Sequence, residues 1–306
     1  MWNKLFGGKK KEEEKLALPS LPAGFKQTIS NSLGSKAIPV LPDSAQRIFM
    51  VVTDPDSQAL DFVAAIEGDE GLSSKIIKIA NSVYYDRGNG SQSVVEAVAT
   101  IGTNELRNIL GASTLSALFP STHPLRDQLW EHNVAVAVFS RELAARKAAG
   151  RENEAFLGGL LHDVGKLLLL EINSTQYEMI LKKAGRNGSF TAEEEEVYPF
   201  NHCELGQFIG ELWNFSDELK MVMRLHHDPL EDLQRASLPL IVKAADLIAH
   251  KLRIGFPSGL TTLQNNASLK VFEALEKLEI SSDGARNLIK DFGKLFDEEK
   301  ERLQMA

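Results

Sequence analysis

The sequence predicts an all-α protein, and three observations support that prediction. No segment shows the sustained alternation of apolar and polar residues that is typical of a half-buried β-strand. Apolar residues instead recur at spacings of three and four along nearly the whole chain, as on the buried face of a helix. The prolines fall mainly between these periodic segments, while Pro124 and Pro239 fall in first helical turns, where a missing N–H is tolerated.

The periodicity predicts five amphipathic helices, then one long helix, then a further series. The five helices are expected over residues 44–54, 57–67, 72–84, 91–101 and 103–119. From Pro124 to Lys147 the apolar residues keep to one side, which predicts a single long helix. The later helices are expected at 152–171, 175–184, 191–197, 202–214, 216–227 and 238–253, with two or three more over 261–305.

Changes in composition divide the chain into four parts. The stretch MWNKLFGGKKKEEEK is interpreted as a disordered basic and acidic tail over residues 1–17, although its aromatic residues could touch a membrane or a partner. Residues 18–120 are expected to form an N-terminal helical lobe, and residues 121–256 a helical core. The segment GFPSG then introduces a C-terminal helical extension over residues 257–306.

Composition and charge restrict the class of protein. The 306 residues, of which 43% are hydrophobic, are enough for a sizeable buried core. The formal net charge of −8 argues against a broad electrostatic grip on nucleic acid. No apolar run approaches the roughly 20 residues of a transmembrane helix, and the N-terminus lacks the apolar centre of a signal peptide. Cys203 is the one cysteine, so no intrachain disulfide can form, and a cytoplasmic protein is favoured.

Ionisable residues interrupt the most apolar segment of the chain. The stretch FLGGLLHDVGKLLLL, residues 156–170, places His162, Asp163 and Lys166 among leucines. Burying a charged group costs several kcal/mol unless it is paired or bound to a metal. A lone histidine here would most simply be a hydrogen-bonded core residue. However, further imidazoles and a carboxylate occupy other predicted helices, namely His132, His202, His226, His227 and Asp246.

Imidazole nitrogens and carboxylate oxygens are common protein ligands of Fe, Mn, Zn and Ni. This set of residues therefore indicates a metal site. Alternatives stay open for individual members, because His162 and Asp163 could form a buried pair and the paired histidines could cap a helix end. Glu131 could replace His132 as a ligand, and Cys203 could be a soft ligand or a small buried hydrophobe.

The order H…HD…H…HH…D, centred on HDVGK, resembles the HD superfamily of metal-dependent phosphohydrolases. The resemblance implies a divalent transition-metal cofactor, with two ions of Fe, Mn, Ni or Zn. One ion would be held by His132, His162, Asp163 and Asp246. Asp163 would bridge to a second ion held by His202, His226 and His227. Lys166 would face a substrate phosphate, so Asp163 and Lys166 are the candidate catalytic residues.

Three longer segments resemble the HDOD domain, an HD-related output domain of bacterial signalling proteins. They are IPVLPDSAQRI at 38–48, DEGLSSKIIKIANSVYY at 69–85 and VVEAVATIGTNELRNIL at 94–110. The likeness extends from about Leu18 to Phe256 and implies an N-terminal helical lobe followed by an HD-like core. HDOD domains typically have lost several HD ligands and are regarded as regulatory, whereas this chain has a residue of the right type at each position.

Two functions are expected from these resemblances. The first is a signal-transduction module that binds a signalling protein partner or a small phosphorylated ligand, with metal as structure or sensor. The second is a phosphohydrolase acting on a nucleotide or cyclic nucleotide, which would need a solvent-open pocket beside the ligands. Cyclic-di-GMP is disfavoured, because the branch that hydrolyses it carries GYP after the paired histidines and HHDPLEDLQRASLPL has neither Gly nor Tyr. No residue selects the redox diiron chemistry that HD folds also support.

Some ionisable residues lie outside this pattern. His123 and His250 are expected at the surface. Glu193 to Glu196 are expected to form a solvated face of a helix, which could repel anions from that part of the surface.

Overall fold

Helices make up all the regular secondary structure of the described chain, which confirms the all-α prediction. The structure is a computed structural model that describes residues 17–34, 40–86, 88, 90–255 and 260–304. The tail predicted over residues 1–17 therefore lies outside the described residues, apart from its last position. Among the described residues, no helix has both the length and the apolar character needed to cross a lipid bilayer.

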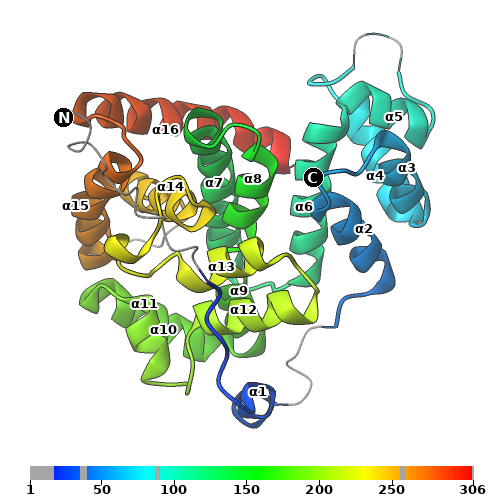
Figure 1. Ribbon diagram of the computed structural model, residues 1–306. Helices are drawn as coiled ribbons and strands as arrows, with labels where there is room; N and C mark the ends of the chain where they lie inside the picture. Colours follow the sequence, from blue (N-terminus) through cyan, green and yellow to red (C-terminus); the bar gives the residue numbers. More distant parts are fainter. Residues whose placement is uncertain (1–16, 35–39, 87, 89, 256–259, 305–306) are drawn as a thin grey trace, which may run out of the picture.

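The helices follow one another in three groups along the chain (Figure 1). The N-terminal group is α1 (Phe25–Leu33), α2 (Asp43–Thr53), α3 (Ala59–Glu67), α4 (Glu70–Ala80), α5 (Val94–Ile101) and α6 (Thr103–Leu118). The central group is α7 (Pro124–Lys147), α8 (Glu152–Leu161), α9 (Val164–Ile172), α10 (Ser174–Asn187), α11 (Phe190–Glu195), α12 (His202–Leu212), α13 (Asp217–Leu225), the 3₁₀ helix η2 (Leu230–Asp232) and α14 (Leu238–Leu252). The last group is α15 (Thr261–Lys277) and α16 (Ser282–Gln304). The sequence periodicity did not predict α1.

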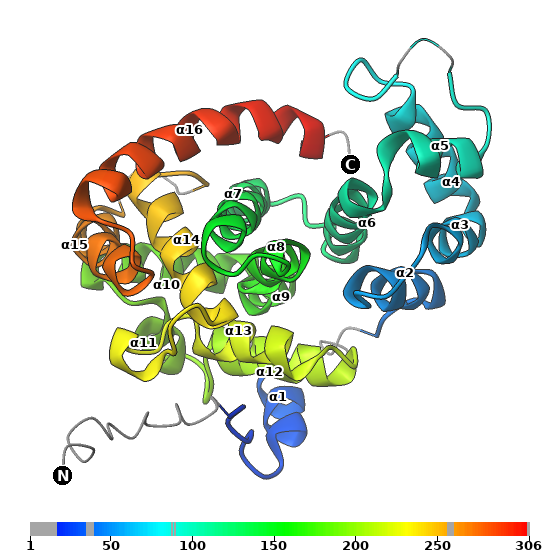
Figure 2. The same cartoon turned by 45° about the horizontal axis from the view of Figure 1, so that its top comes forward.

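The N-terminal helices α2 to α6 lie to one side of the central group (Figure 2). Helix α6 packs against both α2 and α8, and so joins the two groups. The buried apolar side chains form one continuous core that extends from Phe25 to Phe296. Helix α1 lies beside α12 (Figure 2), where the Phe25 ring packs edge-on against Phe200 and Phe208.

Helix α7 is the central support of the site, and its bounds agree with the prediction. Pro124 occupies its first turn, and His123 accepts a hydrogen bond from the N–H of Leu125 at 3.3 Å. Helix α8 approaches α7 closely because Gly159 has no side chain. A Cβ atom at Gly159 would lie 2.7 Å from the Val136 oxygen, closer than real Cβ contacts allow.

The single helix predicted over residues 152–171 is wrong, because the chain turns at His162 and Asp163. Helix α8 ends at Leu161, and Asp163 becomes the N-terminal cap residue of α9. Consecutive residues of an unbroken helix point about 100° apart. The turn removes this restriction, so the adjacent His162 and Asp163 can reach one centre. Apolar residues continue on both sides, which is why periodicity alone could not reveal the break.

The two C-terminal helices pack on the central group. Helix α15 lies against α14 and α10, and α16 runs across α7 as an arc (Figure 2). The Phe292 ring of α16 stacks on Phe139 of α7, with ring centroids 4.9 Å apart. Helices α14 and α15 thus pack against each other, and the candidate metal centre lies beside them.

Candidate metal centre

The seven residues predicted from the sequence as metal ligands come together in the interior of the central group. Helix α7 supplies His132, the α8–α9 turn supplies His162 and Asp163, and α12 begins with His202. His226 and His227 follow the end of α13, and Asp246 lies in the middle of α14. All are buried except His227, which is partly buried.

The Nδ1 atoms of three histidines are already engaged as hydrogen-bond donors. The His162 Nδ1 atom lies 2.6 Å from the Gly159 carbonyl oxygen. The His226 Nδ1 atom lies 3.1 Å from the carbonyl oxygens of Val222 and Met223. A carbonyl oxygen has no proton to donate, so Nδ1 carries the proton in both rings and a neutral ring keeps its lone pair on Nε2.

The third ring, His202, is held by a buried carboxylate. Its Nδ1 atom lies 2.6 Å from Glu194 Oε2, and its backbone N–H donates to the same oxygen at 2.8 Å. Tyr177 donates its hydroxyl proton to the other Glu194 oxygen at 3.1 Å. A carboxylate behind a histidine orients the ring and raises the basicity of its far nitrogen, an arrangement that is common around metal ligands.

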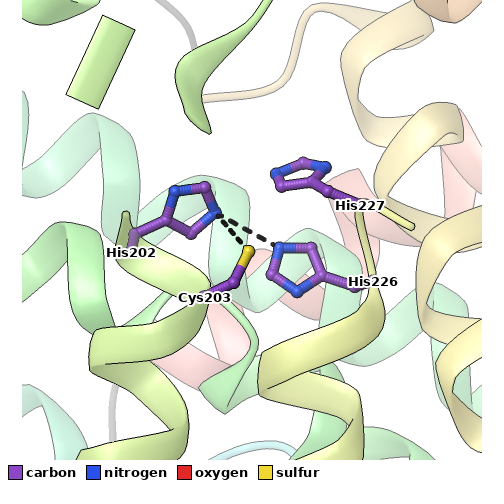
Figure 3. Close-up of side chains that lie close together, drawn as sticks. All are labelled: His202, Cys203, His226 and His227. Carbon is purple, nitrogen blue, oxygen red and sulfur yellow. Dashed lines mark hydrogen bonds between the residues drawn. The ribbon is translucent and has the colours of Figure 1, made fainter. Parts of the chain in front are cut away.

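The Nε2 atoms of these rings converge on the carboxylate of Asp163. His202 Nε2 and His226 Nε2 lie 3.3 and 3.4 Å from Asp163 Oδ1, and His162 Nε2 lies 3.3 Å from Oδ2. Figure 3 shows His202 and Cys203 on one helix facing His226 and His227, and each of these four residues offers a donor atom within 4.8 Å of the others. Lone pairs directed at one another repel, and a cation between them relieves that repulsion.

A second cluster continues from the first towards α14. The His132 Nε2 atom lies 3.0 Å from Asp246 Oδ1, and His250 Nε2 lies 3.2 Å from the same oxygen. The rings of His132 and His162 have centroids 5.5 Å apart, which makes the two clusters neighbours. His132, His162 and Asp163 also offer donor atoms within 4.8 Å of one another. Asp163 therefore has ligand-type atoms on both sides of its carboxylate.

Charge and protonation fit metal ligands. Burial alone would raise the pKa of Asp163, but the charges of His162 and Lys166 hold it well below its ordinary value. The pKa of Asp246 is likewise held well below its ordinary value, because His250 and His132 outweigh the effect of burial. Burial lowers the pKa of His226 to about 4 and holds the pKa of His227 well below its ordinary value. These two imidazoles are therefore neutral at neutral pH and lie near ionised carboxylates, the state that metals require.

Lys166 supplies positive charge to the centre from within the core. Its Nζ atom lies 2.7 Å from Asp163 Oδ2 and 4.1 Å from the centroid of the Phe190 ring. Its side chain is 1% exposed, so it does not reach the solvent. The lysine thus lies where it neutralises Asp163, whereas the HD resemblance implies a role facing a substrate phosphate.

Acid is expected to destabilise the metal-free protein. Burial lowers the pKa of His132 and His226 to about 4, against about 6.5 in an unfolded chain. Between these values the unfolded chain binds more protons, so the free energy of unfolding falls as the pH drops from 6.5 towards 4. His162 opposes this trend, since Asp163 outweighs burial and raises its pKa. Denaturant titration of chelator-treated protein should show a loss on the order of 2 kcal/mol between pH 7 and pH 5, and an unchanged midpoint would contradict it.

Two expectations about residues outside the pattern are wrong. Glu193 and Glu194 are buried rather than solvated, because Glu194 turns inward to His202 and Tyr177; Glu195 and Glu196 are exposed as expected. His250 is buried beside Asp246 rather than at the surface, since it lies one helical turn further along α14.

The structure also decides between alternatives that the sequence left open. Glu131 contacts Lys300 of α16, and it is His132 that enters the cluster. Cys203 is buried, and its Sγ atom lies 3.4 Å from His202 Nε2, so it is both part of the core and within reach of the cluster. Asn201 caps α12 and Glu204 completes its capping box, which sets His202 at the first helical position.

A pocket of about 190 Å³ reaches the centre from the side of α14 and α15. Of the predicted ligands, His227 and Asp246 line it, together with His250. The remaining ligand candidates lie behind these residues and do not line the pocket. The centre is thus closed on most sides and accessible through this pocket.

The family follows from a comparison with known proteins. The sequence model of the HDOD domain matches residues 38–229, more than half of the chain. The chain belongs to the HDOD family. The resemblance inferred from the three sequence segments is thereby confirmed. Helices α14, α15 and α16, and with α14 the candidate ligand Asp246, lie beyond the matched HDOD region.

Solved structures share the HDOD fold at low identity. An HDOD domain protein of unknown function from Geobacter sulfurreducens is 23% identical, with a TM-score of 0.69 over 93% of this chain and 98% of that chain. A Shewanella amazonensis SB2B protein provisionally named a phosphohydrolase is 22% identical, with a TM-score of 0.61 over 88% of this chain and 98% of that chain. A Marinobacter aquaeolei VT8 protein provisionally named a signal transduction protein is 18% identical, with a TM-score of 0.69 over 94% of this chain and 62% of that chain.

One relative by sequence is an uncharacterised protein of Treponema pallidum (strain Nichols). It is 28% identical over 198 residues, which is 62% of this chain. The chain spans 38% of the length of that relative. The relatives thus include proteins named for regulation and for hydrolysis, and the fold alone does not choose between them.

Proposed function

We propose that this HDOD protein is a regulatory module of bacterial signal transduction, built around a buried divalent transition-metal centre. The observation that carries the proposal is the convergence of three Nε2 atoms on the Asp163 carboxylate, with every Nδ1 atom fixed by a hydrogen bond behind it. Such a set of oriented imidazoles around one carboxylate is suited to Fe, Mn, Ni or Zn.

The two oxygens of Asp163 support a centre with two ions. On one side the candidate ligands are His132, His162, Asp163 and Asp246, with His250 within reach. On the other side they are Asp163, His202, His226 and His227, with Cys203 within reach. When bound, the ions would act as Lewis acids and neutralise the buried carboxylates. Among the described lysines, Lys166 is the one that forms an ion pair with Asp163.

Burial of the centre favours regulation over turnover. Most candidate ligands are closed off by side chains, and the pocket of about 190 Å³ reaches only His227, Asp246 and His250. Pockets for drug-sized ligands span about 300 to 1,000 Å³, so a cyclic dinucleotide does not fit inside. We infer that metal occupancy, or a small phosphorylated ligand beside it, sets the state that a signalling partner reads.

Elemental analysis of the purified protein tests the metal centre. We expect about two equivalents of a transition metal per chain, or uptake of two equivalents on unfolding and refolding with Fe, Mn, Ni or Zn. A protein that retains its helical circular dichroism and takes up no metal under any of these conditions would overturn the proposal.

A second candidate function is metal-dependent hydrolysis of a small phosphate ester. It is favoured by the pocket, because Lys243 lines the opening that leads to Asp246 and His227. Asp163 would hold the ions and Lys166 would balance its charge. Metal-loaded protein should then cleave bis(p-nitrophenyl) phosphate or a member of a nucleotide panel. Absence of turnover with two bound metals would leave the regulatory role.

Glu194 is expected to strengthen metal binding without touching a metal. The substitution Glu194→Gln keeps an oxygen for His202 but removes the negative charge behind the ring. Loss of such a partner typically weakens metal affinity by about 10- to 100-fold, which competition with a chromophoric chelator would measure. Glu196→Gln is the matched control, since Glu196 is exposed near the end of the same helix. Equal affinities for the two variants would show that Glu194 has no such role.

A further inference from the structure

The pocket beside the metal centre is built jointly by the HD-like core and the C-terminal helices. Its inner end is formed by His227, Asp246 and His250. One wall is α14 with Lys243, and another is the loop around Ser189. The third wall is α15, which contributes its side chains at Leu263, Asn266, Ala267 and Lys270. The walls on α14 and α15 both lie outside the matched HDOD region, which ends at residue 229.

Two lysines give the outer part of this pocket a positive charge. Lys243 is buried and donates to the His226 carbonyl oxygen at 3.1 Å, which leaves its other two N–H groups available. Lys270 of α15 lines the same pocket, so the two ammonium groups share one cavity. Among the described residues Lys270 has no carboxylate at ion-pair distance. Two neighbouring ammonium groups repel each other, and an anion between them would offset that repulsion.

The wall on the side of α15 is closely fitted. Gly188 adopts a left-handed conformation with φ +85°, and a Cβ atom there would overlap the Asn266 amide nitrogen. The loop therefore lies directly against α15 and closes that edge of the pocket. Asn266 adds an amide beside the two lysines, and amide and ammonium groups are the usual donors to phosphate oxygens.

We propose that this pocket binds inorganic phosphate or the phosphoryl group of a small phosphate monoester, between Lys243 and Lys270. The volume of about 190 Å³ accommodates the phosphoryl group and a small substituent, while a larger substituent would extend through the opening. Asp246 at the inner end carries the opposite charge, so the anion lies at the outer, lysine-lined end. The inference deepens the proposed function by naming a ligand class, and it rests on that function for its link to the metal.

Such a ligand would connect two parts of the protein. Lys243 belongs to α14 of the core, whereas Lys270 belongs to α15 of the C-terminal extension. An anion held by both would strengthen the contact of α15 with α14. The C-terminal helices would then respond to the ligand while the metal centre stays buried.

Calorimetric titration with inorganic phosphate at constant ionic strength tests the proposal. We expect saturable binding by the full chain, with sulfate as the comparison anion. The Lys270→Ala variant should bind phosphate at least about tenfold more weakly, as expected for loss of one charge-assisted hydrogen bond. Lys270 is exposed, so the variant should fold normally. Lys290→Ala, which removes an exposed lysine from α16, is the matched control and should bind like the wild type. The Lys243→Met variant tests the other lysine of the site in the same titration.

Titrating metal-loaded and chelator-treated protein separates this inference from the proposed function. Lysine-dependent phosphate binding by both forms supports the inference, even if no metal is found. Phosphate binding that needs metal but is unchanged by Lys270→Ala and Lys243→Met supports the metal centre and overturns the lysine site. Absence of saturable binding, or equal affinity for phosphate in all variants, also overturns it.

Discussion

The substitution Asp163→Asn is expected to remove the metal from the purified protein almost completely. Among the described residues, Asp163 is the one side chain with candidate ligands on both oxygens, so its loss affects both halves of the centre. An amide is a weaker ligand than a carboxylate and cannot neutralise a cation. We therefore expect the metal affinity to fall by at least about 100-fold, the largest loss typical of mutating residues that only hydrogen-bond to metal ligands. Elemental analysis beside the wild type measures it.

The same change should also destabilise the metal-free protein. Lys166 would stay buried without its partner, and breaking a buried ion pair typically costs about 3–5 kcal/mol. The control is Asp127→Asn, because the Asp127 side chain on α7 is 88% exposed and, within the part of the chain that the structure describes, its one ion pair is with Arg126. Wild-type metal content in Asp163→Asn would show that the carboxylate is not a ligand.

The second large effect is expected at Gly165, in the turn of α9 that contacts α12. A Cβ atom at Gly165 would lie 2.9 Å from the Cα and carbonyl carbon of His202, and closer still to its oxygen. The obstacle is backbone, so the helices must separate and His202 must move. We expect Gly165→Ala to lower the free energy of unfolding by about 3 kcal/mol or more, measured by denaturant titration, and to reduce metal content in parallel.

Gly71→Ala is the matched control for this change. Gly71 is exposed in the first turn of α4, and a Cβ atom there would make only one ordinary contact, 3.4 Å from Asp69 Oδ1. Alanine should be neutral or stabilising by up to about 1 kcal/mol at such a site. If Gly165→Ala were as stable as Gly71→Ala, the close approach of α9 and α12 would not constrain the centre.

Much of the fold could be predicted from the sequence because helical periodicity and proline positions act locally. Helix α7 has the predicted bounds, since Pro124 and a continuous apolar side define it within one segment. The turn at His162 and Asp163 could not be predicted in this way, because it depends on what lies opposite. It is the distant His202 and His226 that make the new direction of Asp163 favourable.

The candidate site, too, could be predicted only in part from the sequence. The order of histidines and aspartates along the chain pointed to seven residues that do come together. Glu194 and His250 were missed because each looked like an ordinary surface residue of an amphipathic helix. Glu194 lies eight residues before His202 in the sequence, but this spacing matches no local pattern that would predict their contact. Whether such a residue turns inward depends on tertiary contacts, here the Tyr177 hydroxyl and the His202 ring.

The closed position of the centre sets the time scale on which a metal could exchange. The candidate ligands extend from His132 to Asp246 along the chain, so the centre is complete only when α7 and α14 have docked. Afterwards most of the ligands are buried, so release of an ion would depend on the pocket at Asp246 or on local unfolding, which is slow compared with exchange at a surface site. A metal enclosed during folding would thus be retained kinetically, and the metal found in the purified protein would record the supply in the cell where the chain folded.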